Sequence, residues 1–133
     1  VNVNAMFMLT STLLPLLKLS QDASVVFTSS SVGRKGRAYW GAYAVSKFAL
    51  EGLMQVLADE LEKSTVRVNS LNPGKARTQM RRQAYPSENI NTLPDPSTLT
   101  TPFIALLGPQ ARGVTGGAFD AQSASSSSSP SGT

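Results

Sequence analysis

The segment Val25 to Lys47, VVFTSSSVGRKGRAYWGAYAVSK, decides the fold of this chain. It begins with an apolar run of β-branched and aromatic residues, Val25-Val26-Phe27, which predicts a buried strand. Three serines, Ser29 to Ser31, follow it, and after a loop with two glycines the pattern becomes helical. Tyr43 and Lys47 are four residues apart, so they share one face of that helix. A serine, a tyrosine and a lysine that converge at a strand end would form a proton-transfer site.

A second strand is predicted downstream of this segment. Residues 24–28 form the first strand, residues 43–63 the long helix, and Val66 to Leu71 the second strand, which ends at the turn Asn72-Pro73-Gly74. Strand, long helix and strand imply a right-handed parallel crossover. Ligands bind in the crevice beyond the carboxyl ends of such strands. Because Ser30 and Pro73-Gly74 both sit at those ends, the pattern places a site there.

The remaining segments are predicted with less detail. Val1 to Leu19 is an apolar helix, expected to be buried on several sides, with Met6 and Met8 in the core and a kink or a shortened last turn at Pro15. Residues 75–101 are polar, show no firm periodicity and are expected to form a mobile lid. A short helix over 98–107 and a third strand over 114–121 follow. Residues 123–133 are Ser-rich, so the domain is expected to span 1–121 and a disordered tail 122–133.

These motifs together identify a family. Ser30, twelve further residues and Tyr43-x-x-x-Lys47 resemble the short-chain dehydrogenase/reductase family. Asn2 in VNVNA fits the family's helix asparagine, and Pro73-Gly74 with Thr78 fits its Pro-Gly-x-x-x-Thr. The order holds over residues 1–120. The stretches VFTSSSVGR, GAYAVSKFA and FDAQ look like a poorly characterised subgroup of bacterial oxidoreductases.

The resemblance implies a fold and a reaction. The fold is α/β, the C-terminal portion of a Rossmann-like doubly wound parallel sheet. The reaction is hydride transfer between NAD(P) and an alcohol or carbonyl substrate, with Tyr43 as general acid or base. Lys47 would favour the phenolate form of Tyr43, Ser30 would bind the substrate oxygen, and Asn2 would hold a water in a proton relay.

The resemblance also implies a cofactor and an assembly. Tyr43, Lys47, Pro73, Gly74 and Thr78 would contact the nicotinamide end of NAD or NADP, with NADP slightly favoured. The helices 1–19 and 43–63 would form a subunit interface in a homo-oligomer, where a glycine at position 52 would allow close approach.

The chain departs from the family at the phosphate-binding motif. Neither Gly-x-x-x-Gly-x-Gly after an early strand nor Asn-Asn-Ala-Gly is present in the sequence. The chain therefore resembles the catalytic half alone, and since it begins with Val1 we expect it to start inside a longer protein. Two alternatives remain open: a non-catalytic fragment that acts by association through its two long helices, and a different α/β binding module with a chance Tyr-Lys pair.

Three site residues have plainer interpretations. Asn2 could be a helix cap, and Ser29 rather than Ser30 could be the serine that faces the substrate. Lys47 could be a solvated lysine, because a polar stripe runs along its helix through Lys47, Glu51, Gln55, Asp59 and Glu62.

Composition limits the remaining possibilities. The 133 residues suit one domain, and they include no cysteine and no histidine, which excludes a disulfide framework, a Cys/His zinc site and a Ser-His-Asp triad. The net charge is +4, and the scattered basic residues include two loop clusters within 34–37 and 75–82. The resemblance places both loops beside the cleft, and no nucleic-acid motif accompanies them, which favours an anionic dinucleotide or an acidic substrate over nucleic acid. We find no metal motif, signal peptide or membrane-spanning run, so a cytoplasmic location is expected.

Overall fold

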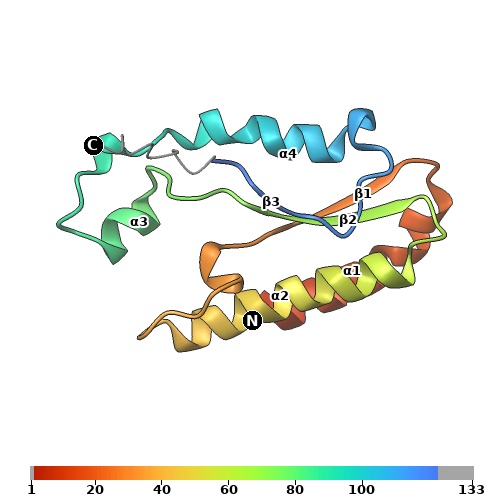
Figure 1. Ribbon diagram of the computed structural model, residues 1–133, viewed down its shortest axis with the longest axis horizontal. Coiled ribbons are helices and arrows are strands. Elements are labelled where there is room, and N and C mark those ends of the chain that lie inside the picture. Colours follow the sequence, from red (N-terminus) through yellow and green to blue (C-terminus); the bar gives the residue numbers. More distant parts are fainter. Residues whose placement is uncertain (1, 123–133) are drawn as a thin grey trace, which may run out of the picture.

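The computed structural model describes residues 2–122. Figure 1 shows a small α/β fold in which every strand is followed or preceded by helix. The helices and strands are α1 (Asn2–Leu19), β1 (Ala23–Thr28), α2 (Gly41–Glu60), β2 (Val66–Asn72), α3 (Gln79–Ala84), α4 (Thr100–Leu107) and β3 (Ala118–Asp120). Four 3-10 turns lie between them: η1 (Ser31–Gly33), η2 (Ile90–Thr92), η3 (Pro96–Leu99) and η4 (Pro109–Ala111).

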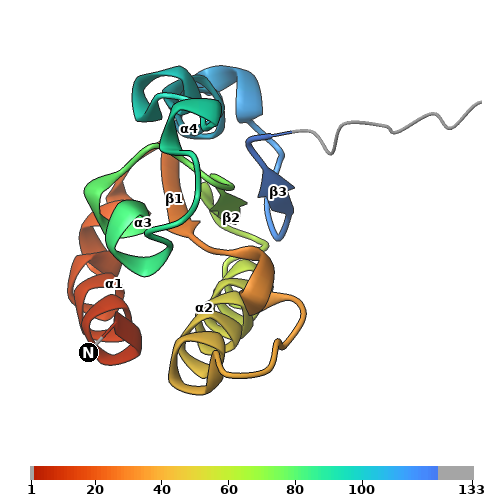
Figure 2. The same cartoon turned by 90° about the vertical axis from the view of Figure 1, so that its left-hand side faces the viewer.

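The sheet has the order β1-β2-β3, and both strand pairs are parallel. Ala23 pairs with Val66 and Thr28 with Leu71, and α2 forms the crossover between these strands. Figures 1 and 2 show α1 and α2 against one face of the sheet and α4 against the other. The parallel α/β architecture predicted from the sequence is therefore confirmed.

The core lies between the sheet and α2. Strand β2 is buried along almost its whole length, and Val68 is fully inaccessible. Leu50, Met54 and Leu57 of α2 pack on this strand, and Phe27 of β1 joins them. A parallel strand that is covered on both faces is buried at nearly every residue, and β2 follows this pattern.

Charged side chains secure the amino end of the sheet. The buried guanidinium of Arg67, on β2, donates to the carboxylate of Asp22 and, at 3.1 Å, to the carbonyl oxygen of Gly108. Arg112 donates to the same carboxylate at 3.0 Å. Burial opposes ionisation of Asp22, but the hydrogen bonds from the two arginines outweigh it and lower the pKa of the carboxyl group.

Helix α1 differs from the sequence prediction. It has the predicted extent and continues through Pro15 to Leu19, but its buried residue is Thr10 rather than the expected apolar core. Met6 packs against the core, whereas Met8 is 67% exposed, so the core assignment of Met8 was wrong. The reason is that α2 and β1 cover one side of α1, and no other described element covers the rest.

The segment 75–101 has more regular structure than its sequence pattern indicates. Its sequence has no firm periodicity, but it contains α3, η2 and η3. Local side-chain caps explain these turns: the hydroxyl of Thr78 accepts a hydrogen bond from the amide of Arg81 at 3.1 Å, and the carboxylate of Asp95 accepts one from the amide of Ser97 at 3.0 Å. The third strand is shorter than predicted, and the predicted disordered tail lies outside the described residues, apart from Gln122.

The carboxyl ends of all three strands lie at one end of the molecule. Figure 1 shows this end on the left, together with α3 and the amino-terminal ends of α1 and α2. Figure 2 looks onto it. Among the described helices none is long and apolar enough to cross a membrane.

Candidate active site

The serine loop begins where β1 ends. Ser30 has extended backbone angles and caps η1, with its hydroxyl oxygen accepting a hydrogen bond from the amide of Val32 at 3.4 Å. The hydroxyl hydrogen of Ser30 is not used in this contact. Ser30 is therefore held in place through its acceptor side and can donate to a ligand beyond the strand end.

Ser29 lies in a different environment. It is 4% exposed, and its hydroxyl has no hydrogen-bond partner among the described residues. Its oxygen lies close to Gly33, since a Cβ built on Gly33 would lie 3.0 Å from it. This burial favours Ser30 over Ser29 as the serine that can reach a ligand.

Gly33 brings the serine loop onto α2. A Cβ at this position would lie 3.0 Å from the Cβ of Lys47 and 3.0 Å from the carbonyl oxygen of Lys47. Real Cβ atoms are rarely so close to backbone, so the absence of a side chain allows the contact. The loop that carries Ser30 therefore rests directly against the turn of α2 that carries Lys47.

Lys47 points toward the strand end. Its ammonium donates a hydrogen bond of 3.0 Å to the carbonyl oxygen of Thr28, the last residue of β1. The ammonium also lies 5.7 Å from the centroid of the Tyr43 ring. Partial burial lowers the pKa of Lys47 from its ordinary value. Although Lys47 belongs to the polar stripe of α2, its charge is directed at the crevice and not into bulk solvent.

Aromatic residues surround Tyr43. Tyr43 is 39% exposed, and its ring makes an edge-to-face contact with Trp40 at 5.6 Å between centroids. Trp40 also stacks on Tyr85, which follows α3, at 6.1 Å. The guanidinium carbon of Arg81 lies over the ring of Tyr85, 3.8 Å from its centroid, in a cation–π contact. Through these contacts α3 lies beside the tyrosine and the strand ends.

The Pro73–Gly74 turn follows β2. Gly74 has φ of +76°, the left-handed region that favours glycine, and its amide donates to the side-chain oxygen of Asn72 at 3.0 Å. The side-chain amide of Gln122 donates to the carbonyl oxygens of Pro73 and Lys75 at 2.8 and 2.7 Å. Hydrogen bonds from both sides therefore fix the turn.

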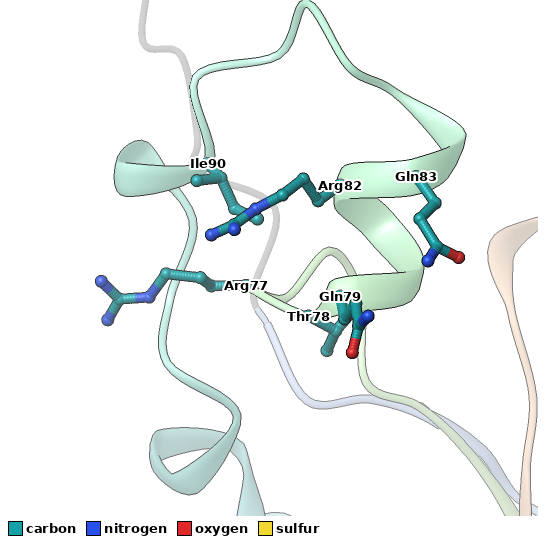
Figure 3. Close-up of a pocket in the computed structure, with 6 residues that line it drawn as sticks. All are labelled: Arg77, Thr78, Gln79, Arg82, Gln83 and Ile90. Carbon is teal, nitrogen blue, oxygen red and sulfur yellow. The ribbon is translucent and has the colours of Figure 1, made fainter.

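A pocket of about 350 Å³ lies next to Thr78. Figure 3 shows Arg77 and Arg82 pointing to one side of α3, with Gln79 and Gln83 on the other. Arg77 pairs with Asp95 at 3.4 Å, whereas Arg82 has no carboxylate within 4 Å among the described residues. The donors that line this pocket suit an anionic or strongly accepting group. The lining residues are Arg77, Thr78, Gln79, Arg82, Gln83 and Ile90.

Asn2 stands apart from the other predicted residues. It is the first residue of α1, is exposed, and makes no side-chain hydrogen bond with another described residue. Its helix begins at the same end of the molecule as the strand ends. The structure thus brings Tyr43 and Lys47 together and rests the loop that carries Ser30 against α2, with Asn2 on the same side without a contact.

Sequence patterns missed several residues at this end of the sheet. Glu51 was assigned to the solvated stripe of α2, but it is 6% exposed and accepts a hydrogen bond of 2.7 Å from the hydroxyl of Ser70. Gln122 was assigned to the tail. Tyr85, an aromatic residue within a polar segment, was the one signal in the sequence that could have been noticed. The described residues hold no group of three carboxylates or other metal ligands.

Known proteins resemble this chain closely. Residues 1–89 match the family model described as short chain dehydrogenase. The uncharacterized oxidoreductase YciK of Escherichia coli is 57% identical over 122 residues, which are 92% of this chain and 48% of YciK. A short chain dehydrogenase structure from Pseudomonas syringae is 63% identical with a TM-score of 0.89, covering 92% of this chain and 50% of the other.

A structure from Escherichia coli CFT073 is described as a complex with NADPH. It is 57% identical to this chain with a TM-score of 0.88, over 92% of this chain and 50% of that one. The chain thus spans about half the length of the relatives it matches.

The close contact at Gly33 generates a prediction. Gly33→Ala should destabilise the protein by about 1–3 kcal/mol, because the added methyl group meets the backbone of Lys47 and the loop must move. Thermal unfolding of the protein that carries both halves of the fold measures the loss. Gly36→Ala in the same loop is the matched control, since a Cβ there meets nothing within 4 Å. Equal melting temperatures for the two variants would contradict the packing seen here.

Proposed function

Because this chain belongs to the short-chain dehydrogenase family, we propose that it is the catalytic half of an NAD(P)-dependent oxidoreductase acting on an alcohol or carbonyl substrate. The observation that carries the proposal is the position of Lys47. Its ammonium lies between the carboxyl end of β1 and the ring of Tyr43, beside the loop that carries Ser30. A solvated surface lysine would have no reason to turn inward and accept the cost of partial burial.

The residues present fit the nicotinamide end of a dinucleotide. A nicotinamide riboside offers hydroxyl and carboxamide groups, and the strand ends present an ammonium on Lys47, a hydroxyl on Thr78 and a backbone turn at Gly74 without a side chain. One ammonium hydrogen of Lys47 is used by Thr28, so others remain for ribose hydroxyls. The pyrophosphate is not provided for in the same way, because the chain has no glycine-rich turn of the required spacing.

NADP is the dinucleotide we favour. The Escherichia coli CFT073 neighbour is described in complex with NADPH and a Shigella flexneri neighbour with NADP, at 57% identity to this chain in both cases. These two neighbours carry the choice, because no residue of this chain is assigned to the 2′-phosphate that distinguishes NADP from NAD. Arg77 and Arg82 instead offer positive charge at the nicotinamide side, where an acidic substrate could use it.

Each side chain of the site has a distinct role in the proposed reaction. When bound, the nicotinamide ring supplies or accepts the hydride. Tyr43 gives a proton to the substrate oxygen during carbonyl reduction and takes it back during alcohol oxidation. The ammonium of Lys47 lowers the free energy of the phenolate that remains on Tyr43. Ser30, fixed by the Val32 amide, donates its hydroxyl hydrogen to the substrate oxygen and stabilises charge there.

Proton exchange with solvent needs a further group. We assign it to Asn2, whose helix begins at the same end of the molecule as Lys47. A water held by the backbone of Asn2 would pass the proton between solvent and the ammonium of Lys47.

Self-association is a second property that we propose for the same protein. The two long helices expose large apolar side chains, among them Phe7 at 57%, Leu16 at 64%, Val45 at 68% and Phe48 at 46%. Patches of this kind on a folded protein mark interaction surfaces. The helices α1 and α2 would therefore form the subunit interface of a homo-oligomer.

The proton donor is tested by Tyr43→Phe in the protein that carries both halves of the fold. This change removes the hydroxyl group and keeps the ring and its contact with Trp40. Turnover of NADPH with a panel of aldehydes and ketones should fall by about two or more orders of magnitude, while the melting temperature stays close to that of the parent. Normal turnover in the folded variant would remove Tyr43 from the mechanism.

The serine assignment is tested by three alanine variants. Ser30→Ala should reduce turnover far more than Ser31→Ala, because the Ser30 hydroxyl alone combines a fixed position with a free donor. Ser29→Ala should leave turnover near that of the parent, since its hydroxyl is buried without a partner. Steady-state kinetics of the three variants measure these losses. If Ser29→Ala lost the most turnover, Ser29 rather than Ser30 would be the serine that faces the substrate.

Residues 1–133 alone should self-associate and bind NAD(P) too weakly for turnover. Strand β1 pairs with β2 on one side and has no second neighbour in the described sheet, so its edge is open to another strand. Size measurement in solution and fluorescence titration with NADH and NADPH test this expectation. A stable monomer that binds NADPH with micromolar affinity would show that the first half of the fold is dispensable.

A further inference from the structure

Two loops must be held in register for the proposed reaction, and this inference rests on that proposed function. Ser30 in the serine loop faces the substrate oxygen, and the Pro73–Gly74 turn faces the nicotinamide ring. They follow different strands, and no hydrogen bond joins them directly among the described residues. Some other group must set the distance between them.

Arg34 extends from the serine loop to the end of β3. It directly follows η1, and its three guanidinium nitrogens all have partners. One donates to the carboxylate of Asp120 at 2.9 Å, and another to the carbonyl oxygen of Phe119 at 2.9 Å. The third lies 3.4 Å from the carboxylate of Glu51 on α2. The planar guanidinium group thus fixes the loop against both the helix and the strand.

Asp120 extends from the same strand to the Pro73–Gly74 turn. The oxygen that accepts from Arg34 also accepts from the side-chain amide of Asn72, at 2.9 Å. The other end of the Asn72 side chain accepts from the amide of Gly74 at 3.0 Å. A continuous line of hydrogen bonds therefore connects the serine loop with the Pro73–Gly74 turn through one carboxylate.

Neighbouring contacts make this line rigid. The backbone amide of Ala121 donates to the carbonyl oxygen of Asn72 at 2.9 Å. The side-chain amide of Gln122 donates to the carbonyl oxygens of Pro73 and Lys75. At the other end, the buried carboxylate of Glu51 accepts a hydrogen bond from Ser70 on β2. Glu51 lies one helical turn after Lys47, so the same network anchors the part of α2 that carries the lysine.

We propose that Asp120 is a positioning residue that holds the serine loop and the nicotinamide-side turn in register through Arg34 and Asn72. Its carboxylate is half exposed, and an exposed ion pair contributes little to stability. Asp120 matters because its carboxylate accepts hydrogen bonds from both loops, from Arg34 and from Asn72. Its loss would leave each loop folded but would let the distance between them vary.

The test is Asp120→Ala in the protein that carries both halves of the fold. Without the carboxylate, hydrogen exchange in the cofactor-free protein should rise ~10-fold at the Gly74 amide and in residues 33–36, and remain unchanged in α1. The dissociation constant for NADPH, measured by the fluorescence of the bound NADPH, should rise by about 10-fold. Asp120→Asn should restore most of both properties, because its amide oxygen can still accept from Arg34 and Asn72.

Asp59→Ala is the matched control, since Asp59 is an exposed acid on α2 whose side chain has no hydrogen bond among the described residues. Unchanged exchange at Gly74 in Asp120→Ala would overturn the proposal. Faster exchange with an unchanged NADPH dissociation constant would also overturn it, because the network would then be structural alone. A parent protein that fails to bind NADPH would refute the proposed function, whereas the exchange data would still decide whether Asp120 joins the two loops.

Discussion

The parallel pairing of β1 with β2, with α2 as the crossover, is the constraint on which the rest of this structure depends. Parallel strands end at the same edge, so the chain leaves both strands at one end of the molecule. Helix α2 must start at that end to return along the sheet, which places its first turns beside the serine loop. The close contact at Gly33 then sets how near Ser30 and Lys47 can lie.

A buried acid gives this arrangement its rigidity. Glu51 lies between helix and sheet, where an unpaired carboxylate would be strongly destabilising. Ser70 and Arg34 supply donors from two different elements, so the acid can remain in place only while β2, α2 and the loop after η1 keep their relative positions. The Glu51 carboxylate, which would destabilise the fold if it were unpaired, thus links β2, α2 and the loop after η1.

The same architecture leaves one side of the molecule uncovered. Strand β1 stands at the edge of the sheet, and α1 shows apolar side chains such as Phe7 and Leu16 to solvent. The chain also spans about half the length of the relatives it matches.

The sequence by itself determined the strands, the long helices and the parallel crossover, because period, β-branching and the Asn72-Pro73-Gly74 turn are local signals. The choice of Ser30, Tyr43 and Lys47 came from the resemblance to the short-chain dehydrogenase/reductase family and stays a prediction. Spacing alone indicates only that Tyr43 and Lys47 share one face of a helix. Only the tertiary structure showed that Glu51, a member of the polar stripe of α2, is buried, and that Asp120 bonds both the serine loop and Asn72 before the Pro73–Gly74 turn. Those contacts join residues far apart in the chain, and whether a charged side chain meets solvent or a buried partner depends on what packs opposite it.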